Sequence, residues 1–406
     1  MPTAAKQVLI LGAGFGGLAS ATFLRKSLSR KECEITVIDK NRHFIMGILN
    51  LWILSGTRRL EESQAALNKL EDKGIRFLNE EITEINAAKS CITLKATDNK
   101  LQYDYLIVAL GAELAPNLID GFEDNRACFN VYDPHQIANL RDKILSLKSG
   151  RIVICIANVP YKCPPAPYEI SLLINDILIK NGTRKSIDLN IYAPTSISLP
   201  VAGPNISQDV VKLLNDNNIE FHRSHKLKKV LQEKTVEFEN GNKTNYDVLI
   251  VIPPHQVPKV VKKSDLLGDV EQRWIKVDRW TLRTKYQNVF AIGDVTEIEL
   301  EGGITIPKAG IFAEAQAKVV SKQIVDEIKN NNHNSHDSNN ADASKFDGKG
   351  YCFMEVGNKR AGYIEADFYN EGGPTVRLYP PSEKLYQKKL DFEGSRLNEW
   401  LMHYQT

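Results

Sequence analysis

A glycine-rich turn near the start of the chain constrains the fold more than any other feature. It follows the continuous apolar run Val8–Leu11, which is typical of a parallel strand buried on both faces. The turn itself reads Gly12-Ala13-Gly14-Phe15-Gly16-Gly17 and opens a helical pattern of apolar residues. A second apolar run, Ile35–Ile38, ends at Asp39, about 20 residues after the glycines. This arrangement predicts a βαβ unit that binds a dinucleotide.

The glycines of this turn have separate steric roles. Gly12 permits the tight turn, Gly14 lets a pyrophosphate approach the backbone, and Gly17 lets helix and strand pack closely. The helix N-terminus then offers unpaired N–H groups and a positive dipole end to the phosphates. A glycine-rich crossover that binds nothing is the alternative. The residues that we expect to bind the cofactor here are Gly12, Ala13, Gly14, Phe15, Gly16, Gly17, Asp39 and Lys40.

A second strand–turn–helix unit begins at residues 151–156, but its turn has a different composition. Residues 157–169 contain several prolines and no glycine. Prolines lack the N–H groups that hold a pyrophosphate, and side chains at these positions block its approach. The next strand ends at Ala193 and not at an acid. Binding of NADH at the usual place is therefore disfavoured.

Length and charge limit the class of protein. The chain has 406 residues, and its formal net charge of +2 gives no indication of a nucleic-acid partner. At roughly 150 residues per domain, two or three domains are expected. No apolar stretch approaches the roughly 20 residues of a spanning helix, and the N-terminus lacks the pattern of a signal peptide. We expect a cytoplasmic protein.

The six cysteines are spread along the chain without paired metal-ligand spacing, so we expect neither a metal site nor a disulfide scaffold. In a reducing compartment a disulfide would be catalytic more often than structural. Cys163 lies beyond a strand end, where open α/β sheets place their ligands, and Cys352 begins a strand much later. The sequence alone does not show that these two cysteines meet.

Two later segments resemble the flavoproteins that have two dinucleotide-binding domains. They are the buried strand Tyr103–Ala112, which ends in small residues, and the strand Val289–Asp294, which ends in Gly-Asp. The resemblance implies that the first site binds FAD and not NAD. It adds Ala109, Gly111, Gly293 and Asp294 to the cofactor-binding residues, with the aspartate on the ribityl chain and phosphate.

A more specific resemblance comes from the heptapeptide Cys163-Pro164-Pro165-Ala166-Pro167-Tyr168-Glu169, the segment Pro307–Gly310 and the late Tyr351-Cys352. Together they are similar to the sulfide:quinone oxidoreductase and flavocytochrome c sulfide dehydrogenase family. The resemblance implies a redox-active disulfide or polysulfide bridge between Cys163 and Cys352 beside the flavin. It makes Glu169 the acid or base.

The sequence leaves two interpretations open for each of two further residues. Lys308 would stabilise negative charge on the reduced flavin, or it is a solvated surface lysine. Cys128 would correspond to the third cysteine of some members, or it is a packed small side chain. Trp52, Arg58 and Arg59, after the second strand, would line a pocket, or they belong to a charged, solvated turn, which their composition favours.

The expected function is FAD-dependent oxidation of sulfide through Cys163 and Cys352, with two electrons passed to a quinone. One alternative is an enzyme like the type II NADH:quinone dehydrogenases, which would have no use for the two cysteines. Another is a non-catalytic flavoprotein that serves as a redox sensor. Peripheral contact with the cytoplasmic face of a membrane and a homo-oligomeric state stay open.

The predicted fold is α/β, with two Rossmann-like domains and a small C-terminal α+β segment. The FAD domain comprises residues 1–112 and 275–328, and the second domain comprises residues 113–274. Residues 329–349, with His333 and His336, are expected to form a flexible surface loop. In the C-terminal segment, 350–406, a hairpin precedes a helical stripe that docks on the protein itself or on a membrane. The stripe comprises Leu397, Trp400, Leu401 and Tyr404.

Overall fold

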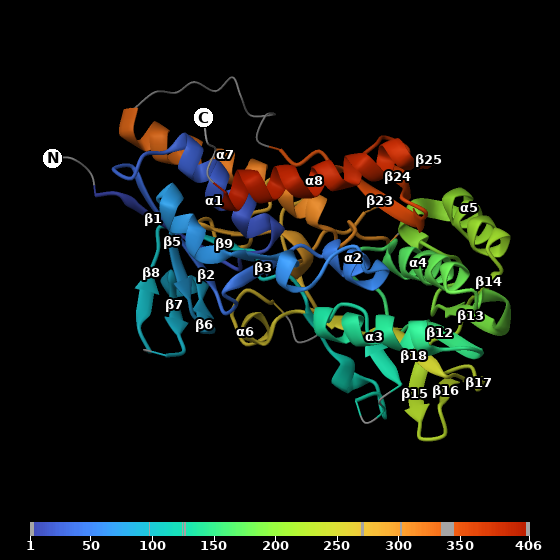
Figure 1. Cartoon of the computed structure of the whole chain (residues 1–406). Coiled ribbons are helices and arrows are strands. Elements are labelled where there is room, and N and C mark those ends of the chain that lie inside the picture. The colour runs from blue at the N-terminus through green and yellow to red at the C-terminus, as the bar shows by residue number, and fades with distance from the viewer. Residues whose placement is uncertain are drawn as a thin grey trace.

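The computed structural model describes residues 4–96, 98–123, 125, 127–268, 272–300, 303–333 and 345–402. His336 and Tyr404 lie outside the described residues, as does most of the predicted loop. Two parallel sheets and a C-terminal layer of strands and one long helix make up the fold (Figure 1). The predicted α/β class is confirmed.

The first sheet has five parallel strands in the order β21-β9-β1-β2-β5. Alternate residues of β1 point to opposite faces, and both faces are buried. Helices α1 and α7 cover one face, and the sheet β6-β7-β8 and helix α6 cover the other. The bounds are β1 Lys6–Leu11, α1 Phe15–Ser27, β2 Cys33–Asp39, β5 Arg76–Asn79, β6 Ile82–Asn86, β7 Cys91–Leu94, β8 Lys100–Gln102, β9 Tyr105–Val108, α6 Lys259–Lys262, β21 Val289–Ala291 and α7 Gly310–His333.

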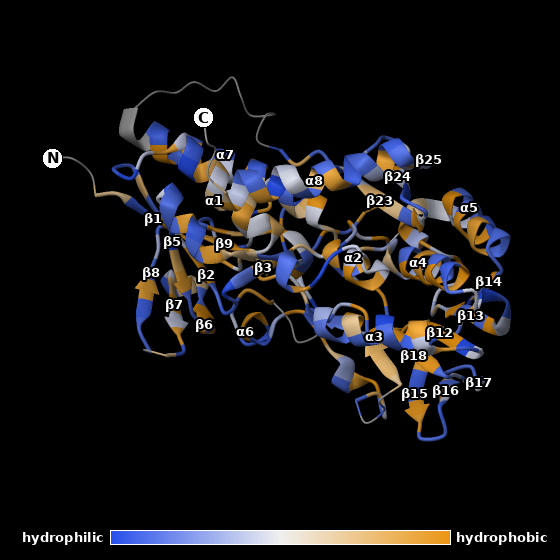
Figure 2. Cartoon of the chain, viewed as in Figure 1, coloured by the Kyte–Doolittle hydropathy of each residue, from blue (hydrophilic) through white to orange (hydrophobic). Residues whose placement is uncertain are grey.

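The second sheet is also parallel, in the order β11-β18-β12-β13-β14. Helices α3, α4 and α5 pack on one face, and the antiparallel sheet β15-β16-β17 packs on the other. Helix α5 is hydrophobic along one side and hydrophilic along the other (Figure 2). The bounds are β11 Cys128–Asn130, α3 Pro134–Ser146, β12 Gly150–Ile156, α4 Ala166–Lys180, β13 Ile187–Tyr192, α5 Gly203–Asp216, β14 Ile219–His222, β15 Leu227–Leu231, β16 Thr235–Phe238, β17 Lys243–Asn245 and β18 Val248–Ile252.

Short elements connect these layers. Strands β3 and β4 pair antiparallel, as do β10 and β19, whereas β20 and β22 pair parallel. The bounds are β3 His43–Ile45, α2 Leu49–Ser55, β4 Gln64–Ala66, β10 Glu113–Leu114, β19 His255–Gln256, β20 Ile275–Lys276 and β22 Thr296–Glu297.

The C-terminal segment forms the antiparallel sheet β23-β24-β25 followed by helix α8. The bounds are β23 Lys349–Gly357, β24 Arg360–Asp367, β25 Thr375–Ser382 and α8 Glu383–Leu401. The predicted hairpin is confirmed, with Cys352 opposite Ile364, but the prediction missed β25. Helix α7 ends at His333, five residues beyond its predicted end at Ile328, so the prediction of a loop was wrong for residues 329–333.

Helix α8 lies along the top of the view in Figure 1, beside α1 at its C-terminal end and beside β24 and β25 at its start. The ring of Trp400 packs edge-on against Phe15 at 5.2 Å and against Phe44 at 6.0 Å between centroids. The described part of the C-terminal stripe therefore docks on the protein itself. None of the described helices combines the length and apolar character needed to cross a membrane.

Candidate active site

The glycine-rich turn between β1 and α1 can be built only with glycine at two positions. Gly12 has a φ of +97°, and a Cβ there would lie 2.5 Å from the carbonyl oxygen of Ala109. A Cβ at Gly17 would overlap the carbonyl oxygen of Gly12. At Gly14, by contrast, a Cβ would meet nothing within 4 Å. The turn thus leaves open space in front of the middle glycine.

This open space lies at the N-terminus of α1, where no side chain caps the helix and the first turn has no acidic residue. The residues present therefore fit the pyrophosphate of a dinucleotide such as FAD. Asp39 accepts a hydrogen bond from the backbone N–H of Ala13 at 2.7 Å, which ties β2 to the turn. Lys40 is exposed. The ring of Phe15 packs on α8, so its backbone N–H is the group that remains for a phosphate.

The other predicted cofactor residues lie at the same carboxyl edge of the first sheet. Ala109 and Gly111 follow β9, and Gly293 and Asp294 follow its neighbour β21. Gly293 has a φ of +72° and donates its N–H to the side-chain oxygen of Gln316 at 2.7 Å. The structure thus gathers both predicted groups on the edge where open α/β sheets bind their ligands.

Lys308 is buried, which rules out the alternative of a solvated surface lysine. Its Nζ donates to the carbonyl oxygens of Asp294 at 2.7 Å and Thr296 at 3.1 Å. The same atom lies 3.4 Å from the centre of the Trp274 ring. Burial lowers the pKa of Lys308 to about 8, against the opposing charge of Asp294. Burial also raises the pKa of Asp294, and here Lys308 and Lys162 oppose it.

Cys163 and Cys352, far apart in the sequence, meet in the structure. Cys163 lies in the loop after β12 with a φ of +57°, and its N–H donates to the carbonyl oxygen of Lys308 at 2.7 Å. A hydrogen bond between the two cysteine side chains raises the pKa of Cys163 well above its ordinary value, and burial adds to this. Both cysteines are free thiols in this structure. The pairing that the sequence left open is therefore sterically available.

An apolar cavity of about 40 Å³ adjoins Cys352. It lies between the Cys163 loop, the start of α7 and the inner face of the C-terminal sheet. Pro164 and Pro165 line one side, and Phe312 lines another. The surroundings of the sulfur atoms are thus apolar on this side.

Glu169 lies in the first turn of α4 and is buried beside the cysteine pair. Its Oε1 accepts from the backbone N–H of Glu355 at 2.8 Å and from Lys389 Nζ at 3.0 Å. The same Lys389 Nζ donates to Glu355 Oε2 at 2.9 Å. Burial raises the pKa of Glu169, and the positive charge of Lys389 opposes this. A carboxyl of this kind suits an acid or base.

Sequence reasoning missed Glu355 and Lys389 and misjudged Trp52. Trp52 is not part of a solvated turn: it is buried on α2 and donates from Nε1 to Glu355 Oε2 at 3.1 Å. One signal was available for Lys389, which precedes Trp400 by about three helical turns and so shares its buried face. No sequence pattern indicates a role for Glu355, because its side-chain partners come from distant segments that only the tertiary fold brings near.

The structure does not bring Cys128 to the cysteine pair. Its Sγ lies 3.5 Å from the hydroxyl of Tyr246, and it packs with Cys155 on the face of the second sheet that β15-β16-β17 covers. Cys163 and Cys352 pack on the opposite face. Burial raises the pKa of Cys128 to about 11, as expected for an inert thiol.

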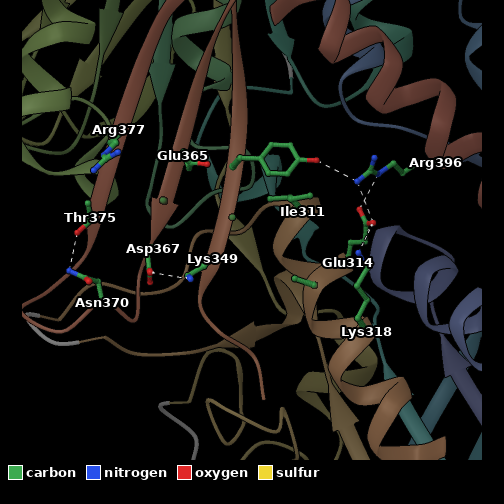
Figure 3. Close-up of a pocket in the computed structure, with 14 residues that line it drawn as sticks. Ile311, Glu314, Lys318, Lys349, Glu365, Asp367, Asn370, Thr375, Arg377 and Arg396 are labelled. Carbon is green, nitrogen blue, oxygen red and sulfur yellow. Dashed lines mark hydrogen bonds and ion pairs between the residues drawn. The ribbon is translucent and has the colours of Figure 1, made fainter. Parts of the chain in front are cut away.

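A larger polar groove of about 580 Å³ lies between α7, the C-terminal sheet and α8 (Figure 3). In it Arg396 Nε lies 3.2 Å from Glu314 Oε2, and Lys318 approaches the same carboxylate at 3.6 Å. Lys349 faces Asp367 across 3.9 Å. The charges of this groove largely face one another, so we assign no chemistry to it.

Comparison with known proteins agrees with this geometry. The model of the pyridine nucleotide-disulphide oxidoreductase family matches residues 6–155 and 188–320. The mitochondrial sulfide:quinone oxidoreductase of Mus musculus is 26% identical over 95% of this chain and 84% of that protein. A type II NADH:quinone oxidoreductase of Staphylococcus haemolyticus is 35% identical, but over 53% of this chain and 56% of that protein.

The crystal structure of the sulfide:quinone oxidoreductase from Aquifex aeolicus has the same fold, with a TM-score of 0.84. The match covers 98% of this chain and 93% of that chain at 24% identity. The similarity to sulfide:quinone oxidoreductases, first indicated by the Cys163 heptapeptide, is confirmed by these relatives. Because the family model spans well over half of the sequence, the chain belongs to the pyridine nucleotide-disulphide oxidoreductase family.

Proposed function

We propose that the protein is an FAD-dependent oxidoreductase that oxidises sulfide through Cys163 and Cys352 and passes two electrons to a quinone. The observation that carries this proposal is that Cys163 and Cys352, from distant segments, pack against the same core cluster and lie near enough for Cys352 to raise the pKa of Cys163. The Cys163 loop is in turn bonded to Lys308, whose side chain holds the segment after β21. Relatives named sulfide:quinone oxidoreductase over most of this chain support the same substrates.

FAD, when bound, supplies the two-electron acceptor between the cysteines and the quinone. The turn Gly12–Gly17 would hold its pyrophosphate, and Asp294 its ribityl chain and phosphate. Lys308 would lie near developing negative charge on the ring, where a buried cation has a large effect.

The sulfur step is a thiol–disulfide exchange. Hydrosulfide attacks one sulfur of a Cys163–Cys352 disulfide, which breaks that S–S bond and forms a new one. The products are a persulfide on one cysteine and a thiolate on the other. Joining the thiolate and the persulfide by a new S–S bond releases two electrons, which FAD would accept when bound, and one proton, which Glu169 would accept.

An anaerobic titration of the yellow protein tests this function against the type II NADH dehydrogenase alternative. We expect sulfide to bleach the flavin and NADH to leave it oxidised, because the loop after β12 lacks phosphate-binding glycines. Bleaching by NADH alone would favour the alternative. Sustained turnover of sulfide with decylubiquinone would exclude a non-catalytic sensor, which could be reduced only once.

For the place of the protein in the cell, we propose peripheral contact with the cytoplasmic face of a membrane, because quinones are dissolved in lipid. Co-sedimentation with vesicles that contain decylubiquinone tests this. Recovery of all the protein in the supernatant would contradict it.

A further inference from the structure

We propose that Glu169, Glu355 and Lys389 form a triad that shares one mobile proton, so that α8 is a working part of the sulfur site. This inference rests on the proposed function and extends it to two residues outside the family resemblance described above. Lys389 and Glu355 are positioning residues in this scheme, because they act on the sulfur atoms through Glu169.

The three side chains lie together and are shielded from water. The side chains of Lys389, Glu169 and Glu355 are 1%, 2% and 4% exposed. Lys389 Nζ lies 3.0 Å from Glu169 Oε1 and 2.9 Å from Glu355 Oε2, so one ammonium group serves two carboxyl groups. The three side chains come from α4, β23 and α8, and only the tertiary fold brings them together.

The triad contains two carboxyl groups and one ammonium group. With both carboxyl groups ionised, the triad would carry a net negative charge away from water, which is costly. One additional proton removes that charge. Both carboxyl groups are bonded to the same ammonium group, so all three side chains together set how firmly a proton on Glu169 is held.

The charged and titratable neighbours come from every side. Trp52 from α2 donates to Glu355, and its ring lies 5.4 Å from the guanidinium of Arg58. Arg58 pairs at 3.0 Å with Glu393, one helical turn after Lys389 on α8. Burial raises the pKa of Tyr386; the charge of Glu355 raises it further, and the charge of Lys389 lowers it. On the inner side lie Cys163 and Cys352.

The proposed sulfur chemistry releases protons beside the triad. Oxidation of hydrogen sulfide to zero-valent sulfur releases two electrons and two protons, and the protons must leave a largely buried pair of sulfur atoms. The charge of Glu169 raises the pKa of Cys163, whereas the charge of Lys389 lowers it. A proton that moves from sulfur to the triad therefore stabilises the thiolate that it leaves behind.

Two substitutions should shift the ionisation of Cys163 in opposite directions. Lys389→Met removes the ammonium group, so Glu169 and Cys163 should keep their protons to higher pH. Glu355→Gln removes one of the two negative charges that oppose Lys389, so the triad becomes more positive and Cys163 should ionise at lower pH. We expect shifts of about one pH unit, up and down respectively, in the midpoint of Cys163 reactivity.

The measurement is the rate of Cys163 alkylation by iodoacetamide against pH in the full-length, FAD-loaded protein after reduction with dithiothreitol. The pH profile of flavin reduction by sulfide is recorded beside it. Lys388→Met and Glu365→Gln are matched controls, because both side chains are exposed and lie outside the triad. Lys389→Arg should keep the wild-type midpoint of Cys163 alkylation, since arginine keeps the positive charge.

Shifts in the same direction, or none, in folded variants would overturn the proposal and leave the triad a structural ion pair. Should Lys389→Met fail to fold, the proposal is still tested by Glu355→Gln, which should lower the alkylation midpoint, and by Lys389→Arg, which should leave it unchanged. If the wild-type flavin resists sulfide while the alkylation midpoints move as expected, the proposed function fails and the triad stands. If sulfide reduces the wild-type flavin but the alkylation midpoints do not move, the proposed function stands and the triad proposal fails.

Discussion

The loops after β1 and after β12 occupy equivalent places in two parallel sheets and differ in what they offer a ligand. Each follows the carboxyl end of a central strand and leads into a helix. The first presents Gly14 with open space before it, and the second presents Cys163 between stiffening prolines. The same βαβ geometry thus leaves room for a phosphate in one place and presents a cysteine, the proposed sulfur site, in the other.

The helices that follow these loops show the same difference. The first turn of α1 has no acidic residue, so its positive end remains available to an anion. The first turn of α4 carries Glu169, a carboxyl group supplied by the chain itself. A phosphate would meet repulsion at α4 and attraction at α1. The side chains, and not the fold, therefore decide which loop can hold a dinucleotide.

Lys308 connects the Cys163 loop to the segment after β21, which lies at the same carboxyl edge of the first sheet as the glycine turn. Its carbonyl oxygen accepts from Cys163, and its side chain bonds to Asp294 beside the first sheet. One residue thus fixes the distance between the proposed sulfur site and the proposed flavin site. The two loops can be separated chemically by substitutions that affect one and leave the other intact.

The largest effect is expected from Gly14→Leu. Its side chain would fill the space of the pyrophosphate, so the purified protein should lose FAD and with it all flavin-dependent activity. The flavin-to-protein ratio of the purified variant is the measurement. Gly394→Leu is the control, because a Cβ there also meets nothing within 4 Å but lies on α8. Full flavin occupancy in Gly14→Leu would contradict the placement of the FAD pyrophosphate in front of Gly14.

The substitution Cys163→Ala affects the other loop alone. We expect normal FAD content and loss of sulfide-driven flavin reduction by a factor of at least about a thousand, because the attacked sulfur is gone. Stopped-flow absorbance under anaerobic conditions measures this, and dithionite should still bleach the flavin. Cys155→Ala, within β12, is the control. An unchanged sulfide rate would remove Cys163 from the mechanism.

Lys308→Met tests the residue that joins the Cys163 loop to the segment after β21. The pKa of Lys308 is lowered to about 8, so between pH 8 and 10.5 the unfolded chain binds more protons than the folded one. Wild-type stability should therefore rise across this window, by up to about 3 kcal/mol, while the cost of the buried charge is fully present below it. The variant should lack this rise. The measurement is urea unfolding of the FAD-free proteins at pH 8, 9 and 10. If the free energy of unfolding changed with pH equally in the wild type and the variant, this prediction would be contradicted.

The two loops also differ in how far the sequence predicts them. The glycine turn was predictable residue by residue, because strand, turn, helix and Asp39 are neighbours in the chain and their roles are local. The second loop was predictable only as a place where NADH is disfavoured. Its contact with Cys352 depends on how the C-terminal sheet packs on α4, and no local pattern determines that.

The same reason explains the residues that were missed. Lys388 and Lys389 are adjacent and chemically identical, yet one is exposed over the ring of Tyr363 and the other is buried between two carboxyl groups. Their helical phase separates them only once a buried residue such as Trp400 is known. Burial of a charged side chain depends on partners from distant elements, which the sequence does not place.

The smallest effect is expected from Cys128→Ala, which tests whether the second domain has one reactive face or two. Cys128 contacts Tyr246 on the face opposite to Cys163, so its removal should change sulfide-driven flavin reduction by less than about twofold. Loss of its packing should lower the free energy of unfolding by about 1 kcal/mol. Stopped-flow rates and urea unfolding measure the two quantities in the same preparation. A rate that falls as in Cys163→Ala would mean that a third thiol joins the chemistry, and sulfur would then have to move between the two faces of the sheet.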